Sequence, residues 1–292
     1  MNKIFFLLSL SCVFLSSKAV EVDEILTQKD NLKMDLMLSY SNIKRERGVS
    51  LPIQYQTENG DFVTVPTFMG EQQANQDYIN YALNLKYGVN SDLEIFTLLN
   101  LYSSDIHFSQ GSQFETKSDR GFGSWVLGAN YQIKAEDERP SLLVGAMINM
   151  VERVTFSNQE HKNIEFKSYR LSATTYYTVD PLVYLLNISY NYNEKKEYND
   201  LTIDKGEQLL LSPQLYFAVN PYSSIHLGIK YAFIGKSRVD DKVVSNSGSN
   251  ISYSFGSSYE ISSNTIMNIT AEHSKQLNIS RDSLSLGFSY SF

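Results

Sequence analysis

Apolar and small polar residues alternate without a break over the last ten positions of the chain, 283–292. The even positions hold Leu284, Leu286, Phe288, Tyr290 and Phe292, and the odd positions hold serines and one glycine. A period of two predicts a strand with one fully apolar face. About ten residues is also the length of a strand that crosses a bilayer at a tilt. A final aromatic on such a strand is typical of outer-membrane barrels, so we predict that Phe288, Tyr290 and Phe292 form an assembly signal.

The same alternation recurs along the chain and predicts twelve strands in residues 32–292. They are expected at 32–41, 77–89, 93–101, 122–133, 141–151, 166–178, 182–192, 207–219, 224–234, 250–261, 265–274 and 283–292, with an additional strand extension at 62–68. Short turns near 91, 137, 180, 221 and 263 alternate with long connections. We predict an all-β fold, a 12-stranded antiparallel up-and-down transmembrane β-barrel, because this is how outer-membrane barrels are connected.

Aromatic residues are placed as two rings. One set lies beside the short turns and the other beside the long connections. The first comprises Tyr87, Tyr131, Tyr177, Tyr184, Phe217, Tyr259 and Phe292, and the second comprises Tyr40, Tyr81, Trp125, Tyr169, Tyr190, Phe233 and Tyr253. Aromatic girdles at both interfaces are expected of a barrel in a membrane. A soluble β-sandwich, the alternative fold, would not need rings at both ends.

The N-terminus has the features of a secretory signal. Lys3 precedes an apolar run over 4–15, and Ser17 and Ala19 supply small residues before a cleavage site. We predict that residues 1–19 are a signal peptide, which removes Cys12, the one cysteine of the chain. An exported chain without cysteine needs neither disulfides nor thiol chemistry.

Residues 20–31 are expected to form a short periplasmic segment. Val22, Ile25 and Leu26 have the spacing of one helical face, with Asp23 and Glu24 near its start. We predict that this face enters the barrel as a candidate plug helix. A frayed periplasmic tail is the alternative.

Charge and composition narrow the function classes. The formal net charge is −7, and loss of Lys3 and Lys18 with the signal makes it more negative, so nucleic acid is not expected as a partner. The chain has 20 Tyr and 16 Phe but no apolar run of 18 residues after the signal. An exported, aromatic-rich chain of this kind crosses a membrane by closing a barrel, because lipid tolerates no unpaired strand edge.

Titratable residues on the inward positions of the predicted strands are the candidate pore lining. They are Lys33, Asp35, Lys86, Glu94, Arg170, His226, Lys230, Glu260 and Glu272. Both signs of charge are present, so no strong ion selectivity is expected, and His226 and Glu260 are close enough in the predicted barrel to pair. Phe96, Leu98, Leu143, Met147, Val183 and Leu185 share the inward face. The sequence thus predicts a lumen of mixed polarity, with no metal site and no cofactor.

His107 and Ser109 form the one constellation that suggests an enzyme. The segment resembles the His-x-Ser segment of outer-membrane lipid hydrolases, and the two residues share a strand face. Nucleophilic catalysis needs the histidine as base and a third group to orient it. We find no clear third group in the sequence, so a polar loop is favoured and the hydrolase is kept as an alternative. No catalytic residue is assigned.

Four segments carry a resemblance to a known family. They are LSYS at 38–41, VPTFMG at 65–70, LNLKYGV at 83–89, and GFG at 121–123 followed by LGANYQ at 127–132. They resemble the outer-membrane transporter family named for meta-pathway phenol degradation and, more closely, the barrel of the channel that exports functional-amyloid (Fap) subunits. Ser124 stands where the transporter family usually has Asp.

The resemblance implies a channel that passes small solutes or an unfolded polypeptide, and not an enzyme. We expect the barrel in the outer membrane of a Gram-negative bacterium, with both termini periplasmic. Its expected partners are outer-membrane lipid, the barrel assembly machinery, and an unidentified transported solute or exported polypeptide.

Overall fold

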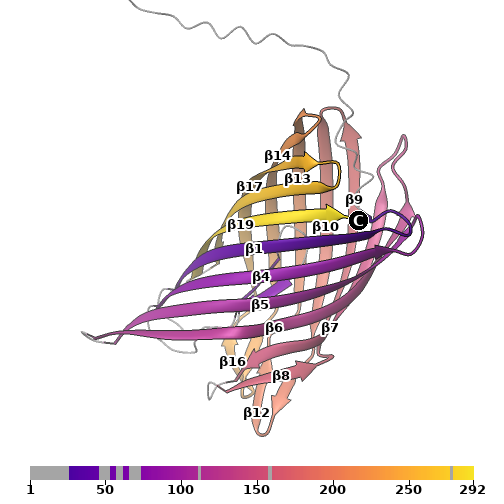
Figure 1. Ribbon diagram of the computed structural model, residues 1–292. Coiled ribbons are helices and arrows are strands. Elements are labelled where there is room, and N and C mark those ends of the chain that lie inside the picture. The colour runs from indigo at the N-terminus through magenta and orange to yellow at the C-terminus, as the bar shows by residue number, and fades with distance from the viewer. Residues whose placement is uncertain are drawn as a thin grey trace, which may run out of the picture.

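The alternating segments fold into one antiparallel sheet that closes on itself, as Figure 1 shows for a computed structural model of the chain. The structure describes residues 26–45, 53–56, 62–65, 74–110, 113–156, 160–276 and 279–292. Within these residues, twelve strands form the barrel wall, which confirms the predicted 12-stranded antiparallel barrel. Closure matters because every strand then has a hydrogen-bonded neighbour on both sides.

The barrel strands follow one another around the wall in chain order. They are β1 (Leu32–Arg45), β4 (Ala74–Gly88), β5 (Leu93–Gln110), β6 (Gln113–Lys134), β7 (Leu142–Thr155), β9 (Ser168–Val179), β10 (Leu182–Asn193), β13 (Gln208–Asn220), β14 (Ser223–Ile234), β17 (Gly248–Ser262), β18 (Thr265–Gln276) and β19 (Ile279–Ser291). The first and last strands close the barrel, with Lys33 opposite Ser291 and Arg45 opposite Ile279. In Figure 1, β1 in indigo lies beside β19 in yellow.

One end of the barrel, the short-turn end, carries the tight connections and the C-terminus. The Asn90 side chain accepts hydrogen bonds from the backbone N–H groups of Asp92 and Leu93, and Asn220 does the same for Tyr222. Asparagine is favoured in turns because its side chain mimics a backbone acceptor. The predicted turns at 91 and 221 are therefore present.

The opposite end, the long-loop end, is built up by additional strands. β8 (His161–Glu165) extends the wall beside β7, and β11 (Lys196–Tyr198), β12 (Leu201–Asp204), β15 (Ser237–Val239) and β16 (Lys242–Ser245) form a separate sheet, which we call the cap sheet. Val154, Phe156 and Ile203 form a buried cluster that joins β7 to the cap sheet. Figure 1 shows β8, β12 and β16 together at this end.

Three expectations differ from the structure. Residues 62–65 do not extend a barrel strand, because β3 (Phe62–Val65) pairs with β2 (Ile53–Gln56) as a short hairpin, and residues 66–68 lie outside the described residues. β5 and β6 run past their predicted ends, since they pair with each other as a ribbon as far as Gln110 and Gln113. Residues 26–31 are not helical and contain an isolated parallel bridge from Lys29 to Gly88. Residues 1–25, with the signal peptide, Val22 and Ile25, lie outside the described residues.

No helix among the described residues is long and apolar enough to cross a membrane.

Candidate functional site: the lumen

The inner wall of the barrel has two chemically different halves. The apolar half, on β5, β6, β7 and β10, presents large hydrophobic side chains inward. Its members are Phe96, Leu98, Val126, Leu143, Met147 and Val183. The polar half, on β14, β17, β18 and β19, presents small hydroxyl and charged side chains at the equivalent positions. Its buried members include Ser224, His226, Lys230, Ser252, Ser254, Thr270, Ser274 and Arg281. The large apolar side chains of the lumen are therefore concentrated on one group of strands, which also presents inward polar residues such as Glu94, Asn100 and Asn191.

The N-terminal segment enters the lumen at the short-turn end. Leu26 is buried against Leu143, Tyr176 and Val183 of the wall. Thr27 donates two hydrogen bonds to one carboxylate oxygen of Glu94, from its backbone N–H at 2.8 Å and from its hydroxyl at 2.6 Å. Hydrogen bonds to a charged acceptor contribute about 1.5–3 kcal/mol each. Apolar burial and charge-assisted bonds thus hold the same segment, residues 26–31, which we call the entry segment.

Gly88 makes room for the entry segment to lie against the wall. A Cβ atom at this position would lie 2.1 Å from the carbonyl oxygen of Gln28. This oxygen belongs to the backbone and cannot move away by a change of rotamer. The backbone of Gly88 also accepts a hydrogen bond from the N–H of Asp30 and donates one to the carbonyl of Asn31. The glycine is therefore required by close backbone approach and not by its φ angle.

The β2–β3 hairpin enters the lumen from the long-loop end, and we call it the lumen hairpin. Val63 of β3 is buried against the inward side chains of Ile43, Tyr78 and Tyr102. The carbonyl oxygen of Gln56 in β2 accepts a hydrogen bond of 3.0 Å from the ammonium group of Lys230 on the opposite, polar half. The hairpin thus spans the lumen between the two halves of the wall.

A cavity of about 160 Å³ lies between the two inserted segments. Leu26 of the entry segment and Gln56 of the lumen hairpin both line it. The rest of its lining comes from β4 to β10 and comprises Asn84, Lys86, Glu94, Phe96, Asn130, Leu143, Val144, Gly145, Met147, Arg170, Ser172, Thr174 and Asn187. The lining therefore combines apolar side chains, amides and hydroxyls, and three charged groups.

One row of register partners builds most of the cavity wall. Lys86 is opposite Phe96, Phe96 is opposite Gly128, and Gly128 is opposite Met147, which is opposite Arg170. A Cβ atom on Gly128 would lie 2.3 Å from the Phe96 ring, so the ring lies over the glycine. The aromatic face and the two cations are thus fixed by strand pairing and not by loops.

Charged groups of the lumen are arranged in contacts that span neighbouring strands. Lys86 and Asp35 form an ion pair of 2.9 Å, and Asn130 donates a hydrogen bond to the second oxygen of Glu94. In the polar half, Lys230 and Arg281 contact the two oxygens of Glu272. A buried carboxylate between two cations avoids the cost of an unpaired charge.

The cap sheet is tied to the barrel by a second buried cluster. Glu152 of β7 lies 3.2 Å from Lys196 and 3.4 Å from Lys205, and both ammonium groups are almost fully buried. Burial, together with the neighbouring Lys196 cation, lowers the pKa of Lys205 to about 8, and the Glu152 carboxylate opposes this shift only in part. Two cations on one carboxylate leave the cluster with a surplus positive charge.

All nine predicted pore-lining residues lie on the inward-facing positions of their strands. That they line a conducting pore stays a prediction. His226 lies 5.2 Å from the ring of Tyr216 and 3.4 Å from the hydroxyl of Thr270. Two inward cations were missed, Arg45 and Arg281, because the predicted strand 32–41 ends before Arg45 and the predicted strand 283–292 begins after Arg281. The alternation continues through Ile43 and Ser283 and was the signal that could have found both.

His107 lies on the outer face of the barrel, at the long-loop end. Its Nε2 atom is 3.3 Å from a carboxylate oxygen of Asp77, and its Nδ1 atom is 3.0 Å from the hydroxyl of Thr116. Asp77 is the orienting group that sequence reasoning missed, because it comes from the neighbouring strand. The side chain of Ser109 lies outside what the structure describes.

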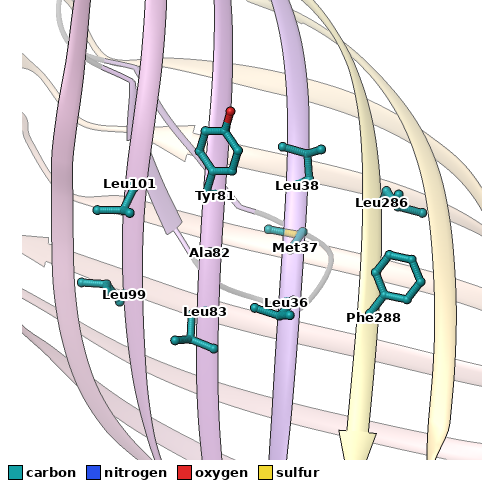
Figure 2. A pocket seen from close by; sticks show the side chains of 10 residues that line it. All are labelled: Leu36, Met37, Leu38, Tyr81, Ala82, Leu83, Leu99, Leu101, Leu286 and Phe288. Carbon is teal, nitrogen blue, oxygen red and sulfur yellow. The ribbon is translucent and has the colours of Figure 1, made fainter.

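The outer face over the closing seam is apolar. A shallow groove of about 350 Å³ lies across β5, β4, β1 and β19, and Figure 2 shows the side chains that line it. It is lined by Leu36, Met37, Leu38, Tyr81, Ala82, Leu83, Leu99, Leu101, Leu286 and Phe288. Most of these side chains are exposed, as is Phe292 at the end of the chain. Such a surface suits contact with lipid acyl chains.

Residues 134–292 match the family model of the outer membrane protein beta-barrel domain. An outer membrane channel from Pseudomonas putida F1 has the same fold, with a TM-score of 0.62 and 10% identity over 92% of this chain and 98% of that one. The translocator domain of the autotransporter NalP from Neisseria meningitidis gives a TM-score of 0.54 and 11% identity over 92% and 91% of the two chains. The monoaromatic hydrocarbon channel CymD gives 0.50 and 12% over 90% and 88%. No curated protein matches the sequence.

Proposed function

The chain belongs to the outer membrane protein beta-barrel family, and from this premise we propose that it is a narrow channel for small solutes. The observation that carries the proposal is the 160 Å³ cavity between the entry segment and the lumen hairpin. A twelve-stranded barrel is wider than an eight-stranded one that side chains fill, but narrower than an open porin. Two inserted segments narrow it further, which favours small solutes over an unfolded polypeptide.

The entry segment acts as a plug in this proposal. Its burial at Leu26 and its bonds from Thr27 to Glu94 support a closed resting state. Burying one leucine contributes about 1.5–3 kcal/mol, so the segment is held by several kcal/mol and still released without unfolding the barrel. Residues 26–31 are not helical, whereas the sequence suggested a helix over 20–31, of which residues 20–25 lie outside the described residues.

The short-turn end faces the periplasm, since short periplasmic turns and long external loops are the rule for outer-membrane barrels. Both termini of the barrel then lie in the periplasm, where the barrel assembly machinery reads Phe292. Deletion of Phe292 is expected to reduce the folded, heat-modifiable barrel in outer-membrane fractions sharply, while Phe255→Ala, at another outward aromatic, is not. Equal assembly of both variants would contradict the recognition role.

Solute entry into proteoliposomes tests the channel directly. The purified full-length protein is expected to make liposomes swell in isotonic arabinose, and much more slowly in raffinose, because the narrow lumen excludes the trisaccharide. Protein denatured by heat before reconstitution is the control. Swelling no faster than that of protein-free liposomes in either sugar, by both the full-length protein and the variant that lacks residues 21–29, would contradict a solute channel.

The lipid hydrolase is not part of the proposal. In a nucleophilic site one nitrogen of the histidine faces the nucleophile and the other faces the orienting acid. Here Thr116 and Asp77 lie at the two nitrogens of His107. Ser109→Ala is therefore expected to leave phospholipid release by the purified barrel at the background rate of the parent, with or without calcium. Calcium-stimulated hydrolysis that disappears in this variant would establish the enzyme instead.

A further inference from the structure

The charged groups in the lining of the cavity are already engaged with other parts of the protein. The contacts are Lys86 with Asp35, Glu94 with Thr27 and Asn130, and Arg170 with Asn191. A charged solute would have to compete with these contacts, whereas a solute of zero net charge would not. The uncharged polar groups of the lining are then the ones that can distinguish between solutes.

Carboxamide oxygens in the lumen, by contrast, are buried without a hydrogen-bond partner. Within the described residues these oxygens belong to Asn80, Asn84, Asn100, Asn187 and Asn250. The side chains lie at inward positions of β4, β5, β10 and β17. A buried acceptor that lacks a donor costs free energy, so a group that donates a hydrogen bond to it is favoured there.

Two of these asparagines line the cavity. Asn84 of β4 is only 4% exposed, and Asn187 comes from β10. The Nδ2 atom of Asn187 donates a hydrogen bond of 2.8 Å to the hydroxyl of Thr174, which orients the carboxamide and leaves its oxygen without a donor. Around the wall, β5, β6, β7 and β9 separate β4 from β10. A solute in the cavity therefore meets acceptor oxygens from two sides.

The acceptors continue from the cavity toward the long-loop end. Asn100 of β5 is opposite Ala82 of β4, and Asn80 and Asn84 occupy the inward positions on either side of Ala82. We call Asn80, Asn84 and Asn100 the asparagine patch. Diagonal neighbours on paired strands are about 7–8 Å apart, so a solute that leaves the cavity along β4 stays close to the next acceptor.

Apolar side chains complete the lining of the cavity. Phe96, Leu143 and Met147 come from the wall, and Leu26 comes from the entry segment. The volume of about 160 Å³ is close to that of an apolar cavity of about 150 Å³ that binds benzene in another protein. The cavity therefore has room for one small solute that has an apolar part.

We propose that the cavity and the asparagine patch select small solutes of zero net charge that combine an apolar part with N–H or O–H donors. Such a solute replaces water at the acceptor oxygens with its own donors. An equally large solute without donors leaves these oxygens unpaired while it occupies the cavity, which slows its passage. The proposal rests on the proposed function of a solute channel and adds the class of solute.

Proteoliposome swelling in two isomeric solutes tests this inference. Valine and glycine betaine consist of the same atoms and have zero net charge at neutral pH, but only the ammonium group of valine can donate hydrogen bonds. Both carry a carboxylate, so contacts of that group are common to the two solutes. Valine is expected to enter about threefold faster or more. Equal rates, or faster entry of glycine betaine, would overturn the proposal.

Variants of the acceptors place the preference at the cavity. In Asn84→Leu the side chain accepts no hydrogen bond, so the ratio of the two rates should fall toward one, and Asn187→Leu should lower it as well. Asn250→Leu is the matched control, because the oxygen of Asn250 is also buried without a partner but this residue does not line the cavity. Heat-modifiable migration identifies the folded barrels. A parental ratio in every folded variant at positions 84 and 187 would contradict the site.

Each solute is also tested with the variant that lacks residues 21–29, so that a closed entry segment does not hide entry. Entry of arabinose without a preference for valine over glycine betaine would overturn this inference and leave the solute channel standing. No entry of arabinose, valine or glycine betaine through either protein would overturn both.

Discussion

On β5, β6, β7 and β10 the inner wall carries large apolar side chains, whereas on β14, β17, β18 and β19 it carries serine, threonine and charged side chains. The apolar half buries Leu26 of the entry segment, and the polar half holds Gln56 of the lumen hairpin through Lys230. Each segment also has a second kind of contact, since Thr27 donates to Glu94 and Val63 is buried against Tyr78 and Tyr102. The two segments therefore differ in the charged group that binds them. A carboxylate accepts two hydrogen bonds from the entry segment, whereas an ammonium group donates one to the hairpin.

Gly88→Val is expected to have the largest effect among the point variants. A Cβ atom at position 88 would meet backbone atoms of Gln28 and Thr27 at 2.1 and 2.5 Å, so the entry segment must leave the wall. Single-channel conductance in planar bilayers should rise several-fold. Gly248→Val is the matched control, since nothing lies within 4 Å of a Cβ atom there. A folded Gly88→Val barrel with parental conductance would mean that the entry segment does not obstruct the lumen.

Removal of the ammonium group tests the other half of the comparison. Lys230→Met removes the donor to Gln56 but leaves Glu272 in contact with Arg281. The lumen hairpin should then leave its position more often, which should appear as added current noise and a conductance increase of about twofold. The exposed Lys236 provides a control in Lys236→Met. If Lys230→Met and Lys236→Met give identical traces, the hairpin is held by Val63 alone.

Leu26→Ala should weaken the entry segment without displacing it. Leucine-to-alanine changes at buried sites cost about 2–5 kcal/mol. Part of this cost raises the free energy of the closed state relative to the open state, in which Leu26 has left the wall. The fraction of time in the open state should rise by roughly tenfold for every 1.4 kcal/mol lost. Leu36→Ala, at an exposed position on the outer face, should change nothing. Equal open times in the two variants would show that Thr27 and Glu94 hold the segment without help from Leu26.

The smallest expected effect concerns the cap sheet above the apolar half. The pKa of Lys205 is lowered to about 8, below its value in an unfolded chain of about 10.4. Between these two pH values the unfolded state binds more protons, so the stability of the cap increases with pH. Hydrogen-exchange protection in residues 196–204, corrected for the intrinsic rate, should therefore increase from pH 7 to pH 9.

Lys205→Met should remove that increase, because Lys196 alone still neutralises Glu152. Lys196→Met leaves Lys205 as the remaining cation at Glu152 and should keep only part of the increase, because burial still lowers the pKa of Lys205 but the Lys196 cation no longer does. A pH dependence that survives in Lys205→Met would assign it to another group.

The outer face was predictable from the sequence because one physical requirement governs it. Lipid demands an apolar side chain at every second position, and Tyr81, Tyr253 and Phe255 are exposed as this requires. The same alternation predicted which residues point into the lumen, including Glu94 and Lys230. The alternation changes in β6 between Ser124 and Phe122, where the register shifts against β5, while β5 keeps its inward positions at Tyr102 and Ser104.

The inserted segments were not predictable in the same way. The position of the lumen hairpin depends on the contact of Val63 with Tyr78 and Tyr102. These three residues come from separate strands. No local pattern in residues 53–65 signals this contact. The entry segment was expected at the lumen from its apolar residues, but its close approach to the wall depends on Gly88, a residue of the wall.

Single-channel conductance of the full-length protein and of the variant lacking residues 21–29, behind an intact signal peptide, tests the plug most directly. Both proteins should assemble equally, as judged by heat-modifiable migration. The truncated channel should conduct several-fold more than the full-length channel, because the contacts of Leu26 and Thr27 with the wall are lost. Equal conductance of two equally folded barrels would show that the segment is only a tail and does not close the channel.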